Sequence, residues 1–328
     1  MRAIGIKAFG GPEVLETLVA GAASPAEGYV RVKVAFAGVN PIDTHVRRGA
    51  YLGSGTGSPT WPLVLGYEGA GVVEAIGPGV DGVKPGDRVT WCGVPGAHAE
   101  MANVPAWRLV PVPDKVPLDI ACALQLDGML AHALSVSVFP LKARDLVLVQ
   151  SGAEPVALLL TQIAKAQGAM VVSTVARDIE IGGPKAAGAD HVVVLAAGDP
   201  VATVRAATDG QGCHVVYDAG GPETVASSLA SCRRRGVVVL YSGRLAPVEQ
   251  VRPDDLAAAG SLYLTRPHLA DFMQDATEVR WRMDGLFDAW IQGQLKVGVG
   301  RILPLDAARE AHIAIESGVA TGKILLKV

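Results

Sequence analysis

The sequence lacks the features that would direct it to nucleic acid, to a membrane or to an oxidising compartment. Its formal net charge is only −3, so charge gives no reason to expect nucleic acid or an anionic membrane as a partner. Its four cysteines show no CxxC spacing, which fits a reducing cytoplasm better than a disulfide scaffold. The first residues carry no apolar signal segment, and no apolar run reaches the length of a membrane span. We therefore expect a soluble, cytoplasmic protein.

What the sequence does contain is enough apolar residues for two domain cores. Half of its 328 residues are apolar and 39 are glycine, which suits a compact α/β protein with many turns. Residues 1–107 have the pattern of short strands broken by glycine and proline, with apolar and polar residues alternating over 29–35 and 71–76. This pattern predicts an all-β, barrel-like domain.

Strands and helices alternate in the second part of the chain. After a predicted helix over 117–132, the expected strands are 146–149, 170–174, 191–195, 213–217, 237–241 and 261–265, with helices between them. Such alternation predicts a parallel sheet with helices on both faces. In the tail, a helix carrying Leu286, Phe287, Trp290 and Ile291 precedes strands at 301–303 and 323–328. We expect this tail to return to the first domain.

The stretch 145–169 combines a buried strand, a tight turn and an amphipathic helix, which is the dinucleotide-binding unit of a doubly wound sheet. In such units, glycines let backbone N–H groups approach a pyrophosphate at the start of the helix. Here that place holds Glu154 and Pro155. Proline has no N–H to donate, and the glutamate carboxylate would repel a phosphate. The sequence thus predicts the frame of a nucleotide site without its phosphate-binding loop.

Five motifs carry a resemblance that covers essentially the whole chain: GVNPID at 38–43, GYEGAGVV at 66–73, KPGDRV at 84–89, GSLYLTRP at 260–267 and TGKILL at 321–326. With them the chain resembles the quinone oxidoreductases, zinc-free members of the medium-chain dehydrogenase/reductase superfamily. The resemblance implies an α/β protein with a GroES-like β-barrel domain over 1–123 and 268–328. It also implies a Rossmann domain with a doubly wound parallel sheet over 124–267, a cleft between the domains, and a homodimer paired through strand 261–265. No metal is expected, because the segments that match the zinc ligands of relatives are Val-Asn-Pro at 39–41 and Gly-Tyr-Glu at 66–68.

Five segments that face NADPH in that family are altered here. The turn at 151–157 has lost both glycines of the family motif, and the 2′-phosphate pocket has Arg177 with the opposing carboxylate of Glu180. The other three segments have the sequences DGMLA at 127–131, YSGR at 241–244 and ESG at 316–318. Residues 181–184, IGGP, are expected to break the helix that normally starts there. We therefore predict that NADPH binding is lost and that the protein uses no cofactor.

The first functional hypothesis is cofactor-independent acid–base chemistry, such as isomerisation, dehydration or cyclisation. Its substrate would be a small hydrophobic carbonyl compound, polyketide-like by analogy with the family's quinones and enones. Asp127 stands where the resemblance places the nicotinamide, and it would exchange protons together with His45. Tyr51, Tyr67 and Asn40 are the candidates to bind the carbonyl oxygen. Two alternatives stay open: His45 could point to solvent, and Asp127 could cap a helix or pair with an arginine.

Further candidates line the predicted substrate cleft, namely Asp43, Trp61, Trp91 and Leu130. The two tryptophans, together with Tyr51, would form an aromatic wall for a flat substrate, although aromatic residues are as often part of a core. For Asp43 we favour a capping role at a short helix over 44–48.

Two other functions stay open. The second hypothesis is an NADPH-dependent quinone or enone reductase, in which Ser151, Ala153, Val156 and Arg177 would still contact the cofactor. Oxidation of NADPH with a quinone acceptor distinguishes it from the first. The third is a non-catalytic protein that binds a ligand, which predicts a stable dimer with affinity for a ligand and no turnover.

Overall fold

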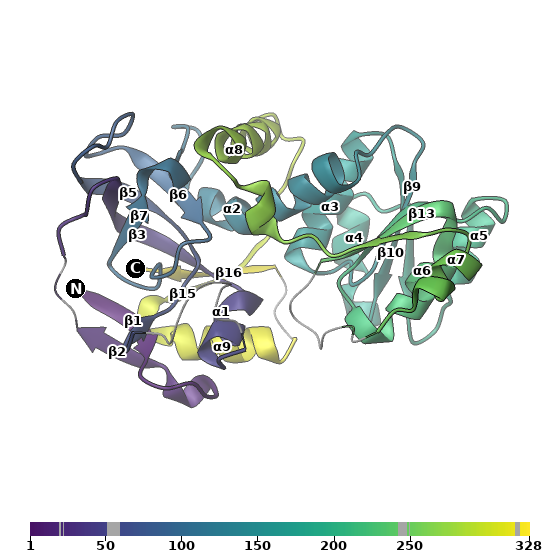
Figure 1. The fold of residues 1–328 in the computed structure, drawn as a ribbon, viewed down its shortest axis with the longest axis horizontal. Helices are drawn as coiled ribbons and strands as arrows, with labels where there is room; N and C mark the ends of the chain where they lie inside the picture. Colours follow the sequence, from purple (N-terminus) through teal and green to yellow (C-terminus); the bar gives the residue numbers. More distant parts are fainter. Residues whose placement is uncertain (20, 22, 51–59, 242–247, 249, 319–321) are drawn as a thin grey trace. The chain divides into compact units, whose positions relative to one another are not determined.

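Two compact units make up the chain. The computed structural model describes residues 1–328 except 20, 22, 51–59, 242–247, 249 and 319–321 (Figure 1). The first unit contains Met1–Leu126, Met273–Ile291 and Val297–Val328, and the second contains Asp127–Phe272 and Gln292–Lys296. The domain limits expected at 123/124 and 267/268 stay a prediction, because compactness does not establish that each part folds alone.

The first unit is built on two sheets whose strands are mostly antiparallel. A seven-stranded sheet has the order β15-β16-β3-β5-β6-β8 with β7 paired to β3, and a three-stranded sheet has the order β2-β1-β4. Alternate residues of β3, among them Val30, Val32 and Val34, are buried in one core. The predicted GroES-like β domain is confirmed. Its strands are β1 (Arg2–Ile6), β2 (Glu16–Val19), β3 (Tyr29–Val39), β4 (Leu63–Val64), β5 (Glu68–Ile76), β6 (Arg88–Cys92), β7 (Met101–Pro105), β8 (Val110–Pro111), β15 (Val299–Pro304) and β16 (Lys323–Lys327).

The C-terminal tail completes the first unit. Strand β16 pairs antiparallel with β3, so that Ile324 lies opposite Val39, and β15 pairs with β16. Helices α8 (Ala276–Ile291) and α9 (Ala308–Glu316) belong to the same unit, and α8 buries the predicted Leu286 and Phe287. The expected return of the tail to the first domain is confirmed.

The second unit contains a six-stranded sheet in which the neighbouring strands are parallel. Its order is β11-β10-β9-β12-β13-β14, which is the strand order of the doubly wound dinucleotide-binding fold. This arrangement confirms the predicted Rossmann fold class. Strand β14 lies at one edge of the sheet, and a homodimer paired through it stays a prediction. The strands are β9 (Leu146–Val149), β10 (Met170–Val175), β11 (His191–Val194), β12 (Cys213–Asp218), β13 (Cys232–Leu240) and β14 (Tyr263–Thr265).

Local signals in the sequence set the helix ends of the second unit. Asp199 caps α5 by accepting a hydrogen bond from the Val201 N–H at 2.8 Å, and Gly168, with a φ of 80°, follows the end of α3.

The helix over Leu118–Val138 is, against expectation, long and apolar enough for a membrane span by length and composition, but 67% of its apolar window is buried. Helix α2 (Leu118–His132) is divided between the two units, and the other helices of the second unit are α3 (Pro155–Ala166), α4 (Gly182–Ala186), α5 (Pro200–Ala207), α6 (Val225–Ser231) and α7 (Pro253–Ala258).

Two expected helix limits are wrong, and proline explains both. Helix α1 covers Pro41–Arg47 rather than 44–48, because Asn40 is the N-cap and proline is well tolerated at the first helical position. Helix α4 forms where a break is expected from the sequence. Pro184 lies in its first turn, where the missing N–H would have no acceptor within the helix in any case.

Candidate functional site

The carboxyl edge of the parallel sheet is the first candidate site, because ligands of this fold bind where the strand order reverses. That point lies between β9 and β12. After β9 the chain turns sharply: Ser151 has a left-handed φ of 56°, and the Gly152 N–H donates to the Thr174 carbonyl at 2.7 Å. A Cβ on Gly152 would lie 1.7 Å from the Ser173 Oγ, so this close approach requires glycine.

Helix α3 begins at this turn and presents backbone donors. Glu154 is its N-cap without a side-chain capping hydrogen bond, and Pro155 is its first residue. The N–H groups of Val156 and Ala157 therefore have no acceptor inside the helix, and they form the positive end of its dipole. Val156 is partly exposed and Ala157 is fully buried, so the Val156 N–H is the donor open to a phosphate of a dinucleotide, while the Glu154 carboxylate weakens the contact. The sequence candidates Ser151, Ala153 and Val156 are all partly exposed here.

A buried hydrogen-bond network supports this edge, and sequence reasoning missed it. The Asp218 carboxylate, at the end of β12, accepts hydrogen bonds from the hydroxyls of Thr224 and Ser228, both at 2.6 Å. Gln150, directly after β9, donates to the Ser228 hydroxyl at 3.2 Å and accepts from the Thr174 hydroxyl at 2.7 Å. All five side chains are buried. The signal in the sequence is a polar residue at or near the end of three aliphatic strands, namely Thr174 in β10, Asp218 in β12 and Gln150 directly after β9.

Tyr241 follows β13 at the same edge, where several carboxylates lie near its buried hydroxyl. Burial raises the pKa of the hydroxyl well above its ordinary value, and the charges of Glu154, Asp218 and Asp127 raise it further. The structure thus places the predicted catalytic residue Asp127 close to this edge, with its side chain buried. The acid–base role of Asp127 stays a prediction. The rest of the altered loop, residues 242–244, lies outside the described residues.

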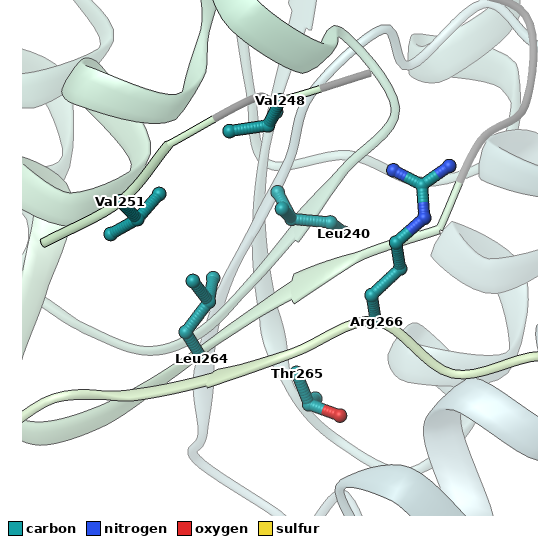
Figure 2. Close-up of a pocket in the computed structure, with 6 residues that line it drawn as sticks. All are labelled: Leu240, Val248, Val251, Leu264, Thr265 and Arg266. Carbon is teal, nitrogen blue, oxygen red and sulfur yellow. The ribbon is translucent and has the colours of Figure 1, made fainter. Parts of the chain in front are cut away.

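A hollow of about 310 Å³ lies at the carboxyl ends of β13 and β14. Figure 2 shows its aliphatic side chains, with Arg266 on the opposite side from Val251. Apolar walls with a few polar groups are the usual composition of a small-molecule site. The position at the carboxyl edge agrees with the ligand site of this fold. The lining residues are Leu240, Val248, Val251, Leu264, Thr265 and Arg266.

The loop after β10 holds Arg177, the sequence candidate for contact with a phosphate. Its guanidinium forms an ion pair with Glu180, in which Nη2 and Oε1 are 2.6 Å apart. The arginine side chain is 54% exposed, so a ligand could reach it from solvent. Any anion that binds Arg177 must compete with Glu180.

In the first unit, the predicted carbonyl-binding residue Asn40 belongs to a buried cluster. Lys323 Nζ lies 2.7 Å from Glu68 Oε2 and donates to Asn40 Oδ1 at 2.6 Å. The Asn40 amide donates in turn to Glu68 Oε2 at 3.0 Å. All three side chains are at most 3% exposed. Because Asn40 follows β3, Glu68 begins β5 and Lys323 begins β16, their contacts join these three strands. A role of Asn40 toward a substrate stays a prediction.

Asp43 lies in the first turn of α1, close to this cluster. Its Oδ2 accepts a hydrogen bond from the Asn40 N–H at 2.8 Å, which is a capping interaction within the helix turn. Burial raises the pKa of the Asp43 carboxyl to about 7, although the backbone hydrogen bond and the charge of Lys323 act in the opposite direction. The group would change charge near neutral pH, but it is fully buried.

The other first-unit candidates differ in their surroundings. His45 has its Nε2 buried and without a hydrogen-bond partner among the described residues. Tyr67 is partly buried against the β core. Tyr51 lies outside the described residues, and Leu130 is partly buried on α2. The catalytic roles of these residues stay predictions.

The two tryptophans of the predicted aromatic wall have different environments. Trp91 is fully buried in the core of the first unit. Trp61 is 39% exposed and meets Phe9 edge-on, with 5.0 Å between the ring centroids. Trp91 therefore contributes to packing, and only Trp61 presents part of its ring to solvent.

Metal ligands and reactive thiols are not evident in the described ranges. No group of three or more His, Cys, Asp or Glu residues comes together there. The four cysteines are free and buried. Burial raises the pKa of the Cys92 thiol to about 12, so this group is not a thiolate nucleophile at neutral pH.

Fold and nucleotide turn together define a medium-chain dehydrogenase/reductase. Residues 26–114 match the alcohol dehydrogenase GroES-like domain, and residues 155–274 match the family described as zinc-binding dehydrogenase. The chain is 34% identical to a quinone oxidoreductase of Salmonella typhimurium over 320 residues, 97% of this chain and 96% of the relative. It is 35% identical to a 2-haloacrylate reductase of a Burkholderia species over 325 residues, 97% of this chain and 96% of the relative. The chain belongs to the quinone oxidoreductase family.

A solved structure contradicts the expectation that the protein uses no cofactor. The quinone oxidoreductase of Escherichia coli complexed with NADPH matches the chain with a TM-score of 0.95 at 32% identity, over 100% of both chains. The predicted isomerase, lyase or cyclase chemistry has no counterpart in these relatives, which are oxidoreductases. The physical reason for the error lies in the backbone. Backbone N–H groups at a helix start can bind phosphate without glycine, so the lost glycines do not by themselves exclude the cofactor.

Proposed function

We propose that the protein is an NADPH-dependent reductase of quinones or other electron-poor conjugated carbonyl compounds. The observation that carries the proposal is the doubly wound parallel sheet whose first strand runs into the Ser151–Gly152 turn and the start of α3. Full-length similarity to quinone oxidoreductases and to a 2-haloacrylate reductase supports it. The residues present fit the cofactor, because the turn keeps its close backbone approach at Gly152 and a helix-start donor at the partly exposed Val156.

The chain's own residues would hold the dinucleotide along the carboxyl edge. The Val156 N–H, at the positive end of the α3 dipole, would bind the pyrophosphate, and Arg177 would face the adenosine ribose. The aliphatic walls of the hollow beside Leu240 and Leu264 would exclude water from a flat ring. When bound, NADPH supplies the hydride for the reaction.

The substrate class follows from the two activities of the relatives. A quinone and a 2-haloacrylate share a double bond that is conjugated to an electron-withdrawing carbonyl group and accepts a hydride. The test is NADPH oxidation, followed by loss of nicotinamide absorbance, with a benzoquinone, a naphthoquinone, a linear enone and 2-chloroacrylate. Acceptor-dependent turnover with at least one of them supports the proposal. If no acceptor gives turnover and calorimetry detects no NADPH binding, the proposal is wrong.

A pair of variants locates the cofactor at the start of α3. Glu154→Gln removes the like charge nearest the helix donors, so we expect it to tighten binding of NADPH and NADH alike, by about tenfold or ~1.4 kcal/mol. Asp209→Asn removes the same charge just before β12, at the opposite edge of the parallel sheet, and Kd should stay unchanged. If the two variants behave alike, the pyrophosphate does not bind at this turn.

A further inference from the structure

The carboxylate of Glu180 fills an anion-binding position in the loop after β10. Its Oε2 accepts hydrogen bonds from the backbone N–H groups of Ala176 and Arg177, at 3.1 and 3.3 Å. Its Oε1 accepts a hydrogen bond from Arg177 Nε at 2.7 Å and lies 2.6 Å from Arg177 Nη2. The Glu180 side chain is only 16% exposed. One carboxylate thus occupies two backbone donors and two nitrogens of a guanidinium.

These donors are of the kind that bind a phosphate, since successive backbone N–H groups and arginine are frequent phosphate ligands. The loop also has the right place in the fold. Strand β10 follows α3 and pairs with β9, so it is the second strand of the nucleotide-binding half. After this strand, an acidic residue binds the free 2′-hydroxyl of the adenosine ribose, whereas an arginine accommodates a 2′-phosphate. Here one loop contains both residue types, and each binds the other.

We propose that Glu180 takes the place of the adenosine 2′-phosphate and determines cofactor specificity, so that the chain binds NADH about as tightly as NADPH. The inference rests on the proposed function, because it concerns the same cofactor site. A phosphate monoester carries about −1.5 to −2 charges at pH 7, so the 2′-phosphate must either displace Glu180 or meet a like charge. The 2′-hydroxyl of NADH is neutral and can donate a hydrogen bond to the carboxylate.

Displacement of Glu180 brings NADPH little net gain. A 2′-phosphate that binds Arg177 and the two N–H groups replaces hydrogen bonds that the carboxylate already makes. The displaced carboxylate stays tethered three residues away from Arg177 and still repels the phosphate. Neutralising Glu180 removes both effects for NADPH and neither for NADH, so the two cofactors should respond differently.

The test measures Kd of both cofactors by calorimetry for the full-length protein and for Glu180→Gln, which keeps an acceptor oxygen without the charge. In the unmodified protein we expect the two Kd values to lie within about threefold of each other. In Glu180→Gln, NADPH should bind about tenfold tighter, while the Kd of NADH changes by less than about threefold. Asp178→Asn is the matched control, because it removes an exposed carboxylate from the same turn and leaves the ion pair between Arg177 and Glu180 in place.

A double variant identifies the group that gains the phosphate. Arg177→Gln added to Glu180→Gln should abolish the gain for NADPH, because the freed guanidinium is the group that binds the phosphate. Three results would overturn the inference and leave the reductase proposal standing: a preference for NADPH above about tenfold in the unmodified protein, an unchanged ratio in Glu180→Gln, or an equal shift in Asp178→Asn. Failure of both cofactors to bind any of these proteins would overturn the proposed function as well.

Discussion

Replacing Gly152 by alanine tests how closely the turn after β9 packs on β10. The new Cβ would lie 1.7 Å from Ser173 Oγ, 3.1 Å from Ser173 Cβ and 3.2 Å from the Thr174 carbonyl oxygen. Gly152 is not in the left-handed region, so the cost is steric rather than conformational. Ser173 is fully buried, and its oxygen has no solvent to move into. We expect the free energy of unfolding to fall by about 1–3 kcal/mol, the usual range for overpacking.

Ser173→Ala should have the opposite effect and should rescue the first variant. Ser173 Oγ has no hydrogen-bond partner among the described residues, and leaving a buried polar group unsatisfied costs about 1–3 kcal/mol. Its removal should therefore raise stability by about 1 kcal/mol. In Gly152→Ala/Ser173→Ala the 1.7 Å overlap is gone and the 3.1 Å contact stays. Most of the loss should be recovered, which corresponds to a coupling energy of about 2 kcal/mol.

The measurement is urea unfolding followed by far-ultraviolet circular dichroism. Tryptophan fluorescence would not report on this turn, because all five tryptophans belong to the first unit. Gly182→Ala is the matched control in the second unit: a Cβ there meets nothing within 4 Å, and stability should change by less than about 0.5 kcal/mol. Either an unchanged stability of Gly152→Ala or a double variant no more stable than Gly152→Ala would refute the reasoning.

Buried titratable side chains give three further predictions, on pH dependence, on stability and on activity. Burial lowers the pKa of His98 to about 4 and the pKa of His312 to about 2. Between about pH 6.5 and 4 the unfolded chain therefore binds more protons than the folded protein, and stability falls on acidification. Each of the two histidines contributes about 1.4 kcal/mol to this loss for every pH unit. Asp43, whose pKa is raised to about 7, offsets one of the two over this window, and Asp43→Asn should therefore steepen the decline measured by unfolding at several pH values. Lys323→Met removes the counterion of the buried Glu68 carboxylate, which keeps its hydrogen bonds from Asn40 and Leu126, and should lower the free energy of unfolding by about 3–5 kcal/mol in urea titrations. A loss below about 1 kcal/mol would contradict the buried ion pair. Asp127→Asn should keep acceptor-dependent NADPH oxidation within about threefold of the unmodified protein if the reductase proposal holds, and a loss of activity above about a hundredfold would return Asp127 to an acid–base role.

Short-range signals predicted the element types of the second unit. Leu146–Val149 forms β9 over the residues expected, because four consecutive aliphatic side chains suit a strand buried on both faces. Asp199 and Pro200 mark the start of α5 as expected, since both signals act within one helical turn. The start of β13 is less predictable. The strand begins at Cys232 rather than 237, because pairing with β12 extends it back to the end of α6.

The sequence predicted the charged side chains of the candidate site but not the backbone N–H group that can bind a phosphate. Glu154 and Glu180 are visible in the sequence as carboxylates that oppose a phosphate, and the structure places both at the carboxyl edge. The sequence alone predicts loss of the cofactor from these charges, because the remaining donor is the backbone N–H of Val156, which carries no side-chain signal.

By itself the sequence determined the strands, the helices and the two-part organisation, because periodicities of two and 3.6 residues are set within short windows. Only the tertiary structure decided which polar groups meet. Lys323 reaches Asn40 across 283 positions of the chain, and Gly152 meets Ser173 through the register of two parallel strands. Burial makes such partners obligatory, because a buried polar group without a hydrogen-bond partner costs free energy, and burial is complete only when distant segments have returned to the same sheet.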